Sequence, residues 1–311
     1  MKIIIIGANS VISKALISEL QNFESIELFL YTTNEHKCKK FIESLNVVNK
    51  ISIKSYQDEK FENNADIIIN CVGVGTPKEL NGNYTPWFTT LEKFDNKCIE
   101  YVETNSNCLY ISLSSGSVYG DNFLEPANES TKNEIDVNNM GLNNFYSISK
   151  LYSEAKHRAF KNLNIVDLRI FSFFCRYSDL NSGYFMSDLV NSIKNKTVLS
   201  TKNDDIIRDY VCIKDMLGVI LSCNASEPIN CALDVVSKKP VNKFDILKFA
   251  KELYNLEYKF SDDINCLNSS GQKKSYYSIN NKYESIDFSP KYTSEQTIIN
   301  ELNYIFEVDN N

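Results

Sequence analysis

The chain has 311 residues, of which 43% are hydrophobic, and it carries a formal net charge of −7. This length and apolar content suffice for a substantial core, in one large domain or two closely packed ones. The negative charge argues against a general nucleic-acid binder, which needs a basic surface to displace counterions. No apolar run reaches the roughly 18 residues of a membrane span, and the run near the N-terminus is too short for a signal peptide.

The cysteine and histidine counts bear on redox state and metals. Nine cysteines are an odd number without paired spacing, which predicts reduced thiols in a cytoplasmic protein. With only His36 and His157, and no Cys-x-x-Cys motif, no metal centre is expected. The sequence therefore directs attention to chemistry carried by hydroxyl, amine and carboxyl groups.

The first 20 residues predict a strand, a tight turn and a helix. Four consecutive Ile precede Gly7, and apolar residues recur at helical spacing after Ser10, where the helix is expected to begin. The unpaired N–H groups and the positive dipole end of such a helix suit a pyrophosphate. An ordinary strand-to-helix turn is the alternative.

Five more strands are expected, at 26–31, 50–56, 65–73, 108–113 and 164–171. Because helical stretches separate them, they predict an α/β fold with a doubly wound, Rossmann-like parallel sheet. We expect a dinucleotide-binding domain at residues 1–174 and a smaller α/β substrate-binding region at 175–311. The chain is expected to cross back to the first domain near 207–235.

Three residues around the fifth predicted strand and the next helix indicate proton transfer. Tyr146 and Lys150 are four residues apart, so they share one face of a helix, one turn apart. A nearby cation favours the phenolate form, so Lys150 is expected to poise Tyr146 for proton transfer near neutral pH. Ser115 lies just beyond the strand, at the edge where open parallel sheets bind ligands. Tyr-x-x-x-Lys also occurs at 56–60, 152–156 and 210–214, where an exposed helix or loop is the plainer interpretation.

Together these motifs resemble the extended short-chain dehydrogenase/reductases, in the NAD-dependent epimerase/dehydratase family that modifies nucleotide sugars. That family opens with Gly-x-x-Gly-x-x-Gly, where this chain has Gly7, Ser10 and Ser13. Residues 207–216 are similar to the family's Arg-Asp-[Phe/Tyr]-Val signature, and residues 279–292 to its C-terminal motif. The matches follow one another in the family's order over almost the whole chain.

The resemblance implies roles for individual residues. Tyr146 would be the general acid or base at the reacting oxygen, Lys150 would hold the nicotinamide ribose, and Ser115 would hydrogen-bond the substrate oxygen. Ser115 is chosen over Ser114 because it stands four residues before Tyr119, as the family's catalytic Ser or Thr does. The other residues expected at the cofactor are Gly7, Asn9, Ser10, Val11, Ile12, Thr32, Thr33, Lys37, Cys71, Val72 and Gly73.

The implied substrate is a nucleoside-diphosphate sugar. Arg208 matches the family arginine that contacts the diphosphate, and its planar donors suit phosphate, although an ion pair with Asp209 is equally compatible. Lys273 and its neighbour lie where the family often has another phosphate-binding arginine. The family's Asn-x-Tyr-Gly-Pro loop reads Ser172-Phe-Phe-Cys-Arg176 here, so Ser172 and Arg176 are expected to meet a different sugar or to lie in a rearranged loop.

The reaction is narrowed by residues that are missing. The related 4,6-dehydratases carry Thr-Asp-Glu where this chain has Ser115-Gly116-Ser117, so it lacks the carboxylates that expel water. Reduction of a ketone and 4-epimerisation remain. A non-catalytic dinucleotide-binding sensor or scaffold is a further alternative, because two glycines of the opening motif are lost. The retained Ser115, Tyr146 and Lys150 argue against a sensor.

The end of the second strand bears on the cofactor. NAD enzymes place an acid there to bind the ribose 2′-hydroxyl, whereas residues 31–34 offer no carboxylate and Lys37, Lys39 and Lys40 follow. This favours NADP(H) over NAD(H), with lysines on a surface helix as the alternative interpretation. Because dissociable NADPH suits net reduction, we expect NADPH-dependent reduction of a nucleotide-linked 4-keto-6-deoxy sugar, with a 4-epimerase holding NAD as the alternative. Relatives commonly dimerise, so a homodimer is expected.

Overall fold

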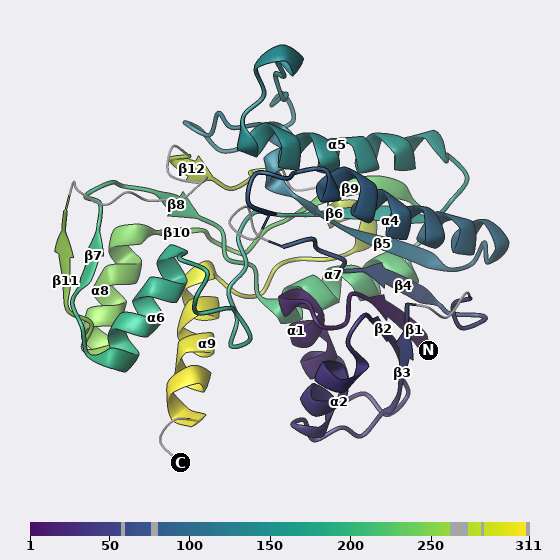
Figure 1. The fold of residues 1–311 in the computed structure, drawn as a ribbon, viewed down its shortest axis with the longest axis horizontal. Coiled ribbons are helices and arrows are strands. Elements are labelled where there is room, and N and C mark those ends of the chain that lie inside the picture. Colours follow the sequence, from purple (N-terminus) through teal and green to yellow (C-terminus); the bar gives the residue numbers. More distant parts are fainter. Residues whose placement is uncertain (57–59, 76–79, 262–272, 281–282, 309–311) are drawn as a thin grey trace.

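The computed structural model describes residues 1–56, 60–75, 80–261, 273–280 and 283–308. A seven-stranded parallel sheet in the order β3-β2-β1-β4-β5-β6-β9 lies at its centre (Figure 1). Its strands are β1 (Lys2–Ile6), β2 (Glu27–Thr32), β3 (Lys50–Ser55), β4 (Ile67–Asn70), β5 (Leu109–Ser115), β6 (Ile165–Ile170) and β9 (Asn230–Val235). The predicted doubly wound α/β fold is confirmed.

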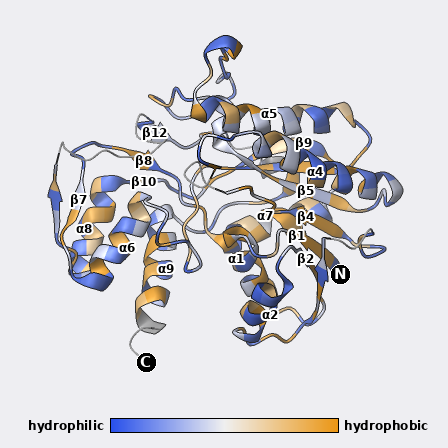
Figure 2. Cartoon of the chain, in the orientation of Figure 1, coloured by the Kyte–Doolittle hydropathy of each residue, from blue (hydrophilic) through white to orange (hydrophobic). Residues whose placement is uncertain are grey.

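Helices cover both faces of this sheet. They are α1 (Val11–Leu20), α2 (Glu35–Glu43), α4 (Pro86–Thr104), α5 (Leu142–Ala159) and α7 (Ile213–Ala225). Ile3 and Ile5 of β1 pack in one cluster with Leu16 of α1, whereas Ile4 and Ile6 pack in another that includes residues of α4. Successive strand residues point to opposite faces, so four consecutive isoleucines can all be buried. Figure 2 colours the strands of this sheet by hydropathy, with hydrophobic residues in orange.

A smaller region lies beside the carboxyl edge of the main sheet (Figure 1). It contains α6 (Phe185–Asn195), β7 (Leu199–Thr201), β8 (Ile207–Arg208), β10 (Val241–Asn242), α8 (Lys243–Tyr254), β11 (Tyr258–Phe260), β12 (Ser275–Tyr276) and α9 (Ser294–Val308). Strand β8 pairs with β10 and β12, and β7 pairs with β11. Between β8 and β10 the chain returns through α7 and β9 to the main sheet. Two residues of the predicted C-terminal motif, Asn281 and Lys282, lie outside the described residues.

Strand β5 is longer than the sequence predicted. Ser114 and Ser115 pair with Arg169 and Ile170 of β6, so Ser115 is the last residue of the strand instead of following it. Short 3-10 helices follow at Gly116–Tyr119, Val137–Asn139 and Tyr283–Ile286. Among the helices of the described ranges, none has the length and apolar character needed to cross a membrane.

The turn after β1 requires glycine. Gly7 has φ +82°, and a Cβ there would lie 2.7 Å from the Cys71 carbonyl oxygen and 2.9 Å from the Val72 amide nitrogen. The Gly7 and Ala8 amides both donate to the Tyr31 carbonyl, at 3.0 and 3.1 Å. The backbone after β1 is therefore held directly against the backbone that follows β4.

We expect Gly7→Ala to destabilise the protein by about 2–4 kcal/mol, because both the positive φ and the contact with Cys71 oppose a side chain. Gly73→Ala is the matched control, since a Cβ at Gly73 would meet nothing within 4 Å. Urea unfolding of the three proteins measures the difference. Equal stability of the two variants would contradict the close approach at Gly7.

Candidate active site

The two serines at the glycine positions of the opening motif fit the turn without strain. Ser10 is the N-cap of α1 with φ −70°, a conformation open to any residue, and its side chain accepts a hydrogen bond from the Ser13 amide at 3.2 Å. Ser13 is fully buried and donates through its hydroxyl to the Gly7 carbonyl at 2.8 Å. At both positions the chain has serine in place of glycine, and each serine hydroxyl forms a hydrogen bond inside the turn.

Backbone N–H groups in the first turn of α1 are available to bind a ligand. Within the described residues, the amides of Val11 and Ile12 have no hydrogen-bond partner, and both residues line a large cavity. The helix dipole adds partial positive charge at the same end. A glycine cradle and two available amides at a helix N-terminus fit the pyrophosphate of a dinucleotide.

The end of β2 is organised by amide and hydroxyl groups. Asn9 donates through Nδ2 to Thr32 Oγ1 at 2.6 Å and to the Asn34 carbonyl at 2.9 Å. Thr32 is buried, whereas Thr33 and Lys37 are exposed, and Lys37 lies in the first turn of α2. Asn9 and Thr32 could meet the ribose of a bound dinucleotide without a carboxylate.

The structure brings the helix carrying Tyr146 and Lys150 against the end of β5. Lys150 donates through Nζ to the carbonyl oxygen of Leu113, two residues before Ser115, at 2.8 Å. Tyr146 lies one turn earlier on α5 and is half-buried, with its ring 5.3 Å from that of Trp87 on α4. The hydroxyl of Tyr146 forms no hydrogen bond in the part of the chain described.

Ser115 and Ser114 have different surroundings because adjacent strand residues point to opposite faces. Ser114 donates to Glu154 Oε1 at 2.5 Å, and Glu154 is bound in turn by Arg169. Ser115 Oγ lies 3.4 Å from the hydroxyl of Tyr276. Ser114 is thus engaged in an internal hydrogen-bond network, while Ser115 lies beside Tyr276, a residue of the large cavity.

Tyr276 is a residue that sequence reasoning missed. It lies on β12, contacts Ser115, and lines the large cavity. Burial and a smaller electrostatic contribution from Tyr146 raise the pKa of Tyr276, so its hydroxyl stays protonated. Nothing in the local sequence distinguishes it from its neighbour Tyr277, because the pairing of β12 with β8 decides which tyrosine points inward.

The predicted loop after β4 begins against the Gly7 turn. Burial raises the pKa of the Cys71 thiol to about 12, although a hydrogen bond with Ser13 and the charge of Lys150 oppose this. Val72 donates its amide to Asn70 Oδ1 at 3.1 Å, and Gly73 follows in the loop. Cys71 is therefore an uncharged, buried residue whose backbone lies against the Gly7 turn.

A cavity of about 550 Å³ lies between the two regions of the molecule. Ser172 and Arg208, both predicted at the substrate, line it together with Tyr276. Arg208 is buried on β8 and donates to the carbonyl oxygens of Ile207 and Lys273, at 2.9 and 2.7 Å. This volume is in the range of small-molecule sites.

Two residues predicted near the substrate, Arg176 and Lys273, are engaged elsewhere. Arg176 forms two side-chain hydrogen bonds with Glu301 of α9, both at 2.8 Å, and its guanidinium stacks 3.6 Å from the ring centre of Tyr304. It is not among the residues that line the large cavity. Lys273 is buried and lies 3.1 Å from Asp121 Oδ1. Arg176 thus attaches α9 to the loop after β6.

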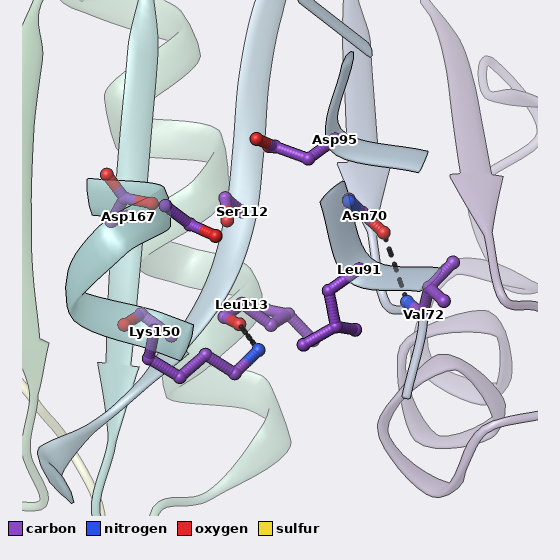
Figure 3. A pocket seen from close by; sticks show the side chains of 10 residues that line it. Asn70, Val72, Leu91, Asp95, Ser112, Leu113, Lys150 and Asp167 are labelled. Carbon is purple, nitrogen blue, oxygen red and sulfur yellow. Dashed lines mark hydrogen bonds between the residues drawn. The ribbon is translucent and has the colours of Figure 1, made fainter. Parts of the chain in front are cut away.

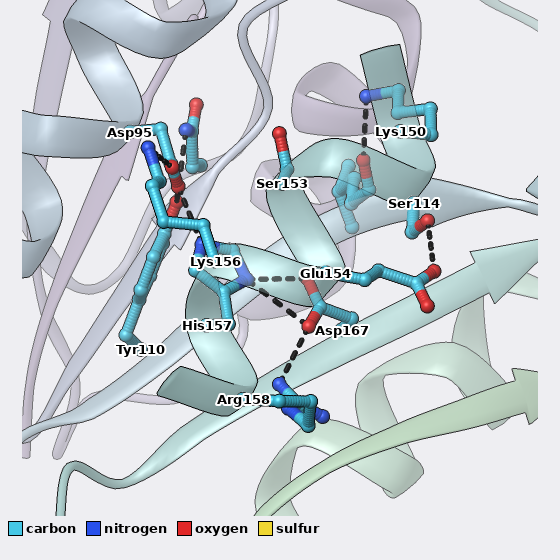
Figure 4. Close-up of polar contacts among 12 residues, drawn as sticks. Asp95, Tyr110, Ser114, Lys150, Ser153, Glu154, Lys156, His157, Arg158 and Asp167 are labelled. Atoms are coloured by element: carbon cyan, nitrogen blue, oxygen red, sulfur yellow. Dashed lines mark hydrogen bonds and ion pairs between the residues drawn. The ribbon is translucent and has the colours of Figure 1, made fainter. Parts of the chain in front are cut away.

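A buried charged cluster, which the sequence did not predict, surrounds His157 on α5, the helix that also carries Lys150 (Figure 4). His157 of α5 is fully buried, with Nδ1 2.8 Å from Asp167 Oδ1 and Nε2 2.7 Å from Asp95 Oδ1. Lys156 pairs with Asp95, and Arg158 pairs with Asp167 at 2.7 Å. Burial opposes a charge on His157, but hydrogen bonds with Asp167 and Asp95 outweigh it and raise the pKa to about 9.

Comparisons with known proteins agree with this fold. A profile of the NAD dependent epimerase/dehydratase family matches residues 3–228, whereas no curated protein matches the sequence. The fold is similar to that of a UDP-N-acetylglucosamine 4-epimerase from Methanobrevibacter ruminantium M1, with a TM-score of 0.80 and 16% identity over 99% of this chain and 98% of that one. It is also similar to a UDP-glucuronic acid 4-epimerase from Bacillus cereus (TM-score 0.73, 16% identity, 99% and 100% covered) and a dTDP-glucose 4,6-dehydratase from Bacillus anthracis (0.74, 14%, 100% and 98%). The chain belongs to the NAD dependent epimerase/dehydratase family.

The prediction of NADP(H) was wrong. The Bacillus cereus epimerase and the Bacillus anthracis dehydratase are both complexes with NAD. The prediction depended on a missing carboxylate and on Lys37, Lys39 and Lys40, which are exposed residues of α2 in the structure. They have the positions expected for lysines that solvate a surface helix, which was the alternative interpretation.

We expect His157→Gln to remove stability that the wild type has at pH 6 and loses as the pH rises through about 9. The sign follows because the ordinary pKa of histidine, 6.5, is raised on folding, so the folded state holds the proton more tightly. The difference in unfolding free energy between the two proteins should be about 3 kcal/mol at pH 6 and smaller at pH 10.

Urea unfolding at several pH values measures this difference. With only two histidines in the chain, ¹⁵N-histidine NMR gives the His157 titration directly once His36→Gln has assigned the other signal. A His157 that loses its proton near pH 6.5 would contradict the charged cluster.

Proposed function

We propose that the protein is a nucleotide-sugar 4-epimerase that keeps NAD bound as its catalyst. The observation that carries this proposal is the combination at the end of β5. Ser115 is followed by Gly116 and Ser117, and it lies beside the helix of Tyr146 and Lys150. This set can move a proton at one hydroxyl, but it lacks the acid pair that removal of water needs.

Packing at Gly116 supports the exclusion of dehydration. A Cβ at Gly116 would lie 2.4 Å from a ring carbon of Phe171, which is itself buried against Phe123 and Tyr276. An aspartate at this position would have to displace that ring from the aromatic cluster. The space next to Ser115 is therefore filled by apolar packing where a dehydratase needs a carboxyl group.

The residues around the β1 turn and α5 fit NAD. Bound NAD would supply a hydride acceptor and donor. In this proposal the Gly7 turn and the amides of Val11 and Ile12 hold the pyrophosphate, and Lys150 holds the nicotinamide ribose. The NAD complexes of structural neighbours support the same choice.

Proton transfer is assigned to α5 and β5. Tyr146 takes the proton from the sugar 4-hydroxyl and later returns it to the same oxygen, so that no net acid or base is consumed. Ser115 donates a hydrogen bond to that oxygen and fixes its position, with the buried Tyr276 hydroxyl beside it. Lys150 donates through Nζ to the Leu113 carbonyl oxygen, and it lies one helical turn from Tyr146 on α5.

The large cavity supports a nucleoside-diphosphate sugar as the substrate. Its volume of about 550 Å³ suits such a ligand, and Arg208 offers a guanidinium for the diphosphate. The sugar nucleotides named for the structural neighbours support a UDP-hexose as the first substrate to test. The ketoreductase expected from the sequence depended on NADP(H), and without that premise the 4-epimerase has more support.

The proposal is tested with UDP-N-acetylglucosamine, UDP-glucuronic acid and UDP-glucose, each incubated with the purified protein and NAD. We expect one of them to be converted to its 4-epimer, measured by NMR of the sugar, without accumulation of NADH at 340 nm. We expect Tyr146→Phe to retain NAD binding but to lose at least about 100-fold in rate, because the phenol that carries the proton is gone.

Tyr152→Phe is the matched control for this substitution. Tyr152 is on the same helix and also precedes a lysine by four residues, but it is 44% exposed and donates to Glu92 on the surface. Its rate should stay within about twofold of the wild type. A Tyr146→Phe enzyme with the full rate would exclude the proposed acid and base, whereas a 4-keto-6-deoxy product would indicate a dehydratase.

A further inference from the structure

A small cavity separates Lys150 from the buried charged cluster (Figure 3). Its volume is about 20 Å³, and its lining includes Lys150 together with Asp95 and Asp167. Lys150 is the one cationic residue and these are the two carboxylates among the described residues that line it. A space of this size holds one water molecule, and therefore also an ammonium group. The cavity is thus a second possible position for the ammonium group of Lys150, next to two carboxylates.

In the structure, the hydrogen bond with Leu113 holds the ammonium group of Lys150 outside this cavity. In the described part of the chain the Nζ of Lys150 is bonded to the neutral carbonyl oxygen of Leu113 and forms no ion pair. A buried carboxylate without a partner attracts a nearby cation strongly, because neither charge is well solvated. Asp95 and Asp167 would compete for Lys150 unless their charges are already compensated.

Lys156, His157 and Arg158 of α5 provide that compensation together, and His157 is the member that contacts both carboxylates at once. Its two ring nitrogens contact Asp95 on α4 and Asp167 on β6, and the His157 side chain is fully buried. Lys156 and Arg158, the residues on either side of it, each pair with one of the carboxylates.

The remaining neighbours of the cluster are neutral. Tyr110 of β5 lies edge-on to the His157 ring and donates to Asp95 at 2.6 Å. Burial keeps the pKa of Tyr110, and of Cys98 on α4, well above its ordinary value. The two negative charges of Asp95 and Asp167 are therefore balanced by the cations of α5 alone.

We propose that His157 is a positioning residue for Lys150: by bridging Asp95 and Asp167 it prevents these carboxylates from drawing the ammonium group into the cavity and away from the dinucleotide. This inference rests on the proposed role of Lys150 in binding the nicotinamide ribose. It explains why a fully buried imidazole stands two helical turns beyond Lys150 on the same helix.

The test is a double-mutant cycle on NAD affinity with His157→Gln, Lys150→Met and the double variant, measured by isothermal titration. In the wild-type background, His157→Gln should weaken NAD binding about tenfold or more, because Lys150 moves to the carboxylates. In the Lys150→Met background, the same substitution should change NAD affinity by less than about twofold. A crystal structure of His157→Gln should show Nζ of Lys150 displaced from Leu113 into the cavity.

Glu301→Gln controls for a general loss of stability. It breaks the ion pair with Arg176, far from Lys150, and should leave NAD affinity unchanged. If His157→Gln does not fold, Lys156→Met, which removes a more exposed cation from Asp95, takes its place in the cycle. Equal weakening by His157→Gln in both backgrounds, or Lys150 unmoved in the crystal, would overturn the inference. A wild-type protein that does not bind NAD would instead refute the proposed function.

Discussion

The hydrogen bond from Lys150 to the carbonyl of Leu113 is the contact on which the arrangement of the site depends. It joins the helix that carries Tyr146 to the strand that ends in Ser115. The position of the Leu113 carbonyl is fixed because β5 lies inside a parallel sheet, with β4 on one side and β6 on the other. Packing of α4 and α5 on one face of that sheet holds the lysine at the sheet's carboxyl edge, where parallel sheets bind ligands.

Much of the fold could be predicted because buried parallel strands are continuous apolar runs bounded by glycine and polar residues. The Ile3–Ile6 run and the turn at Gly7 gave the first β-α unit, and the observed helix begins after Ser10 as expected. Strand ends were less predictable. Ser114 and Ser115 read as a polar loop, but their pairing with β6 and their contacts with Glu154 and Tyr276 make them strand residues.

Contacts between distant segments could not be read from the sequence. Tyr276 reaches Ser115 across 161 positions because β12 pairs with β8, and no local pattern carries that pairing. His157 had no spacing that linked it to Asp95 and Asp167, which lie on two other elements. The cofactor prediction failed for a similar reason. It relied on charge near the end of β2, and the lysines there are exposed surface residues.

The most direct measurement of the proposed 4-epimerase activity follows the hydrogen at C4 of a UDP-hexose substrate. With that substrate deuterated at C4 and the protein loaded with NAD, the proposed mechanism predicts a 4-epimer that retains deuterium at C4, because in it the hydride would leave and return within one site and Tyr146 would move only the hydroxyl proton. Replacement of the label by hydrogen from water, or its accumulation in free reduced cofactor, would contradict the account.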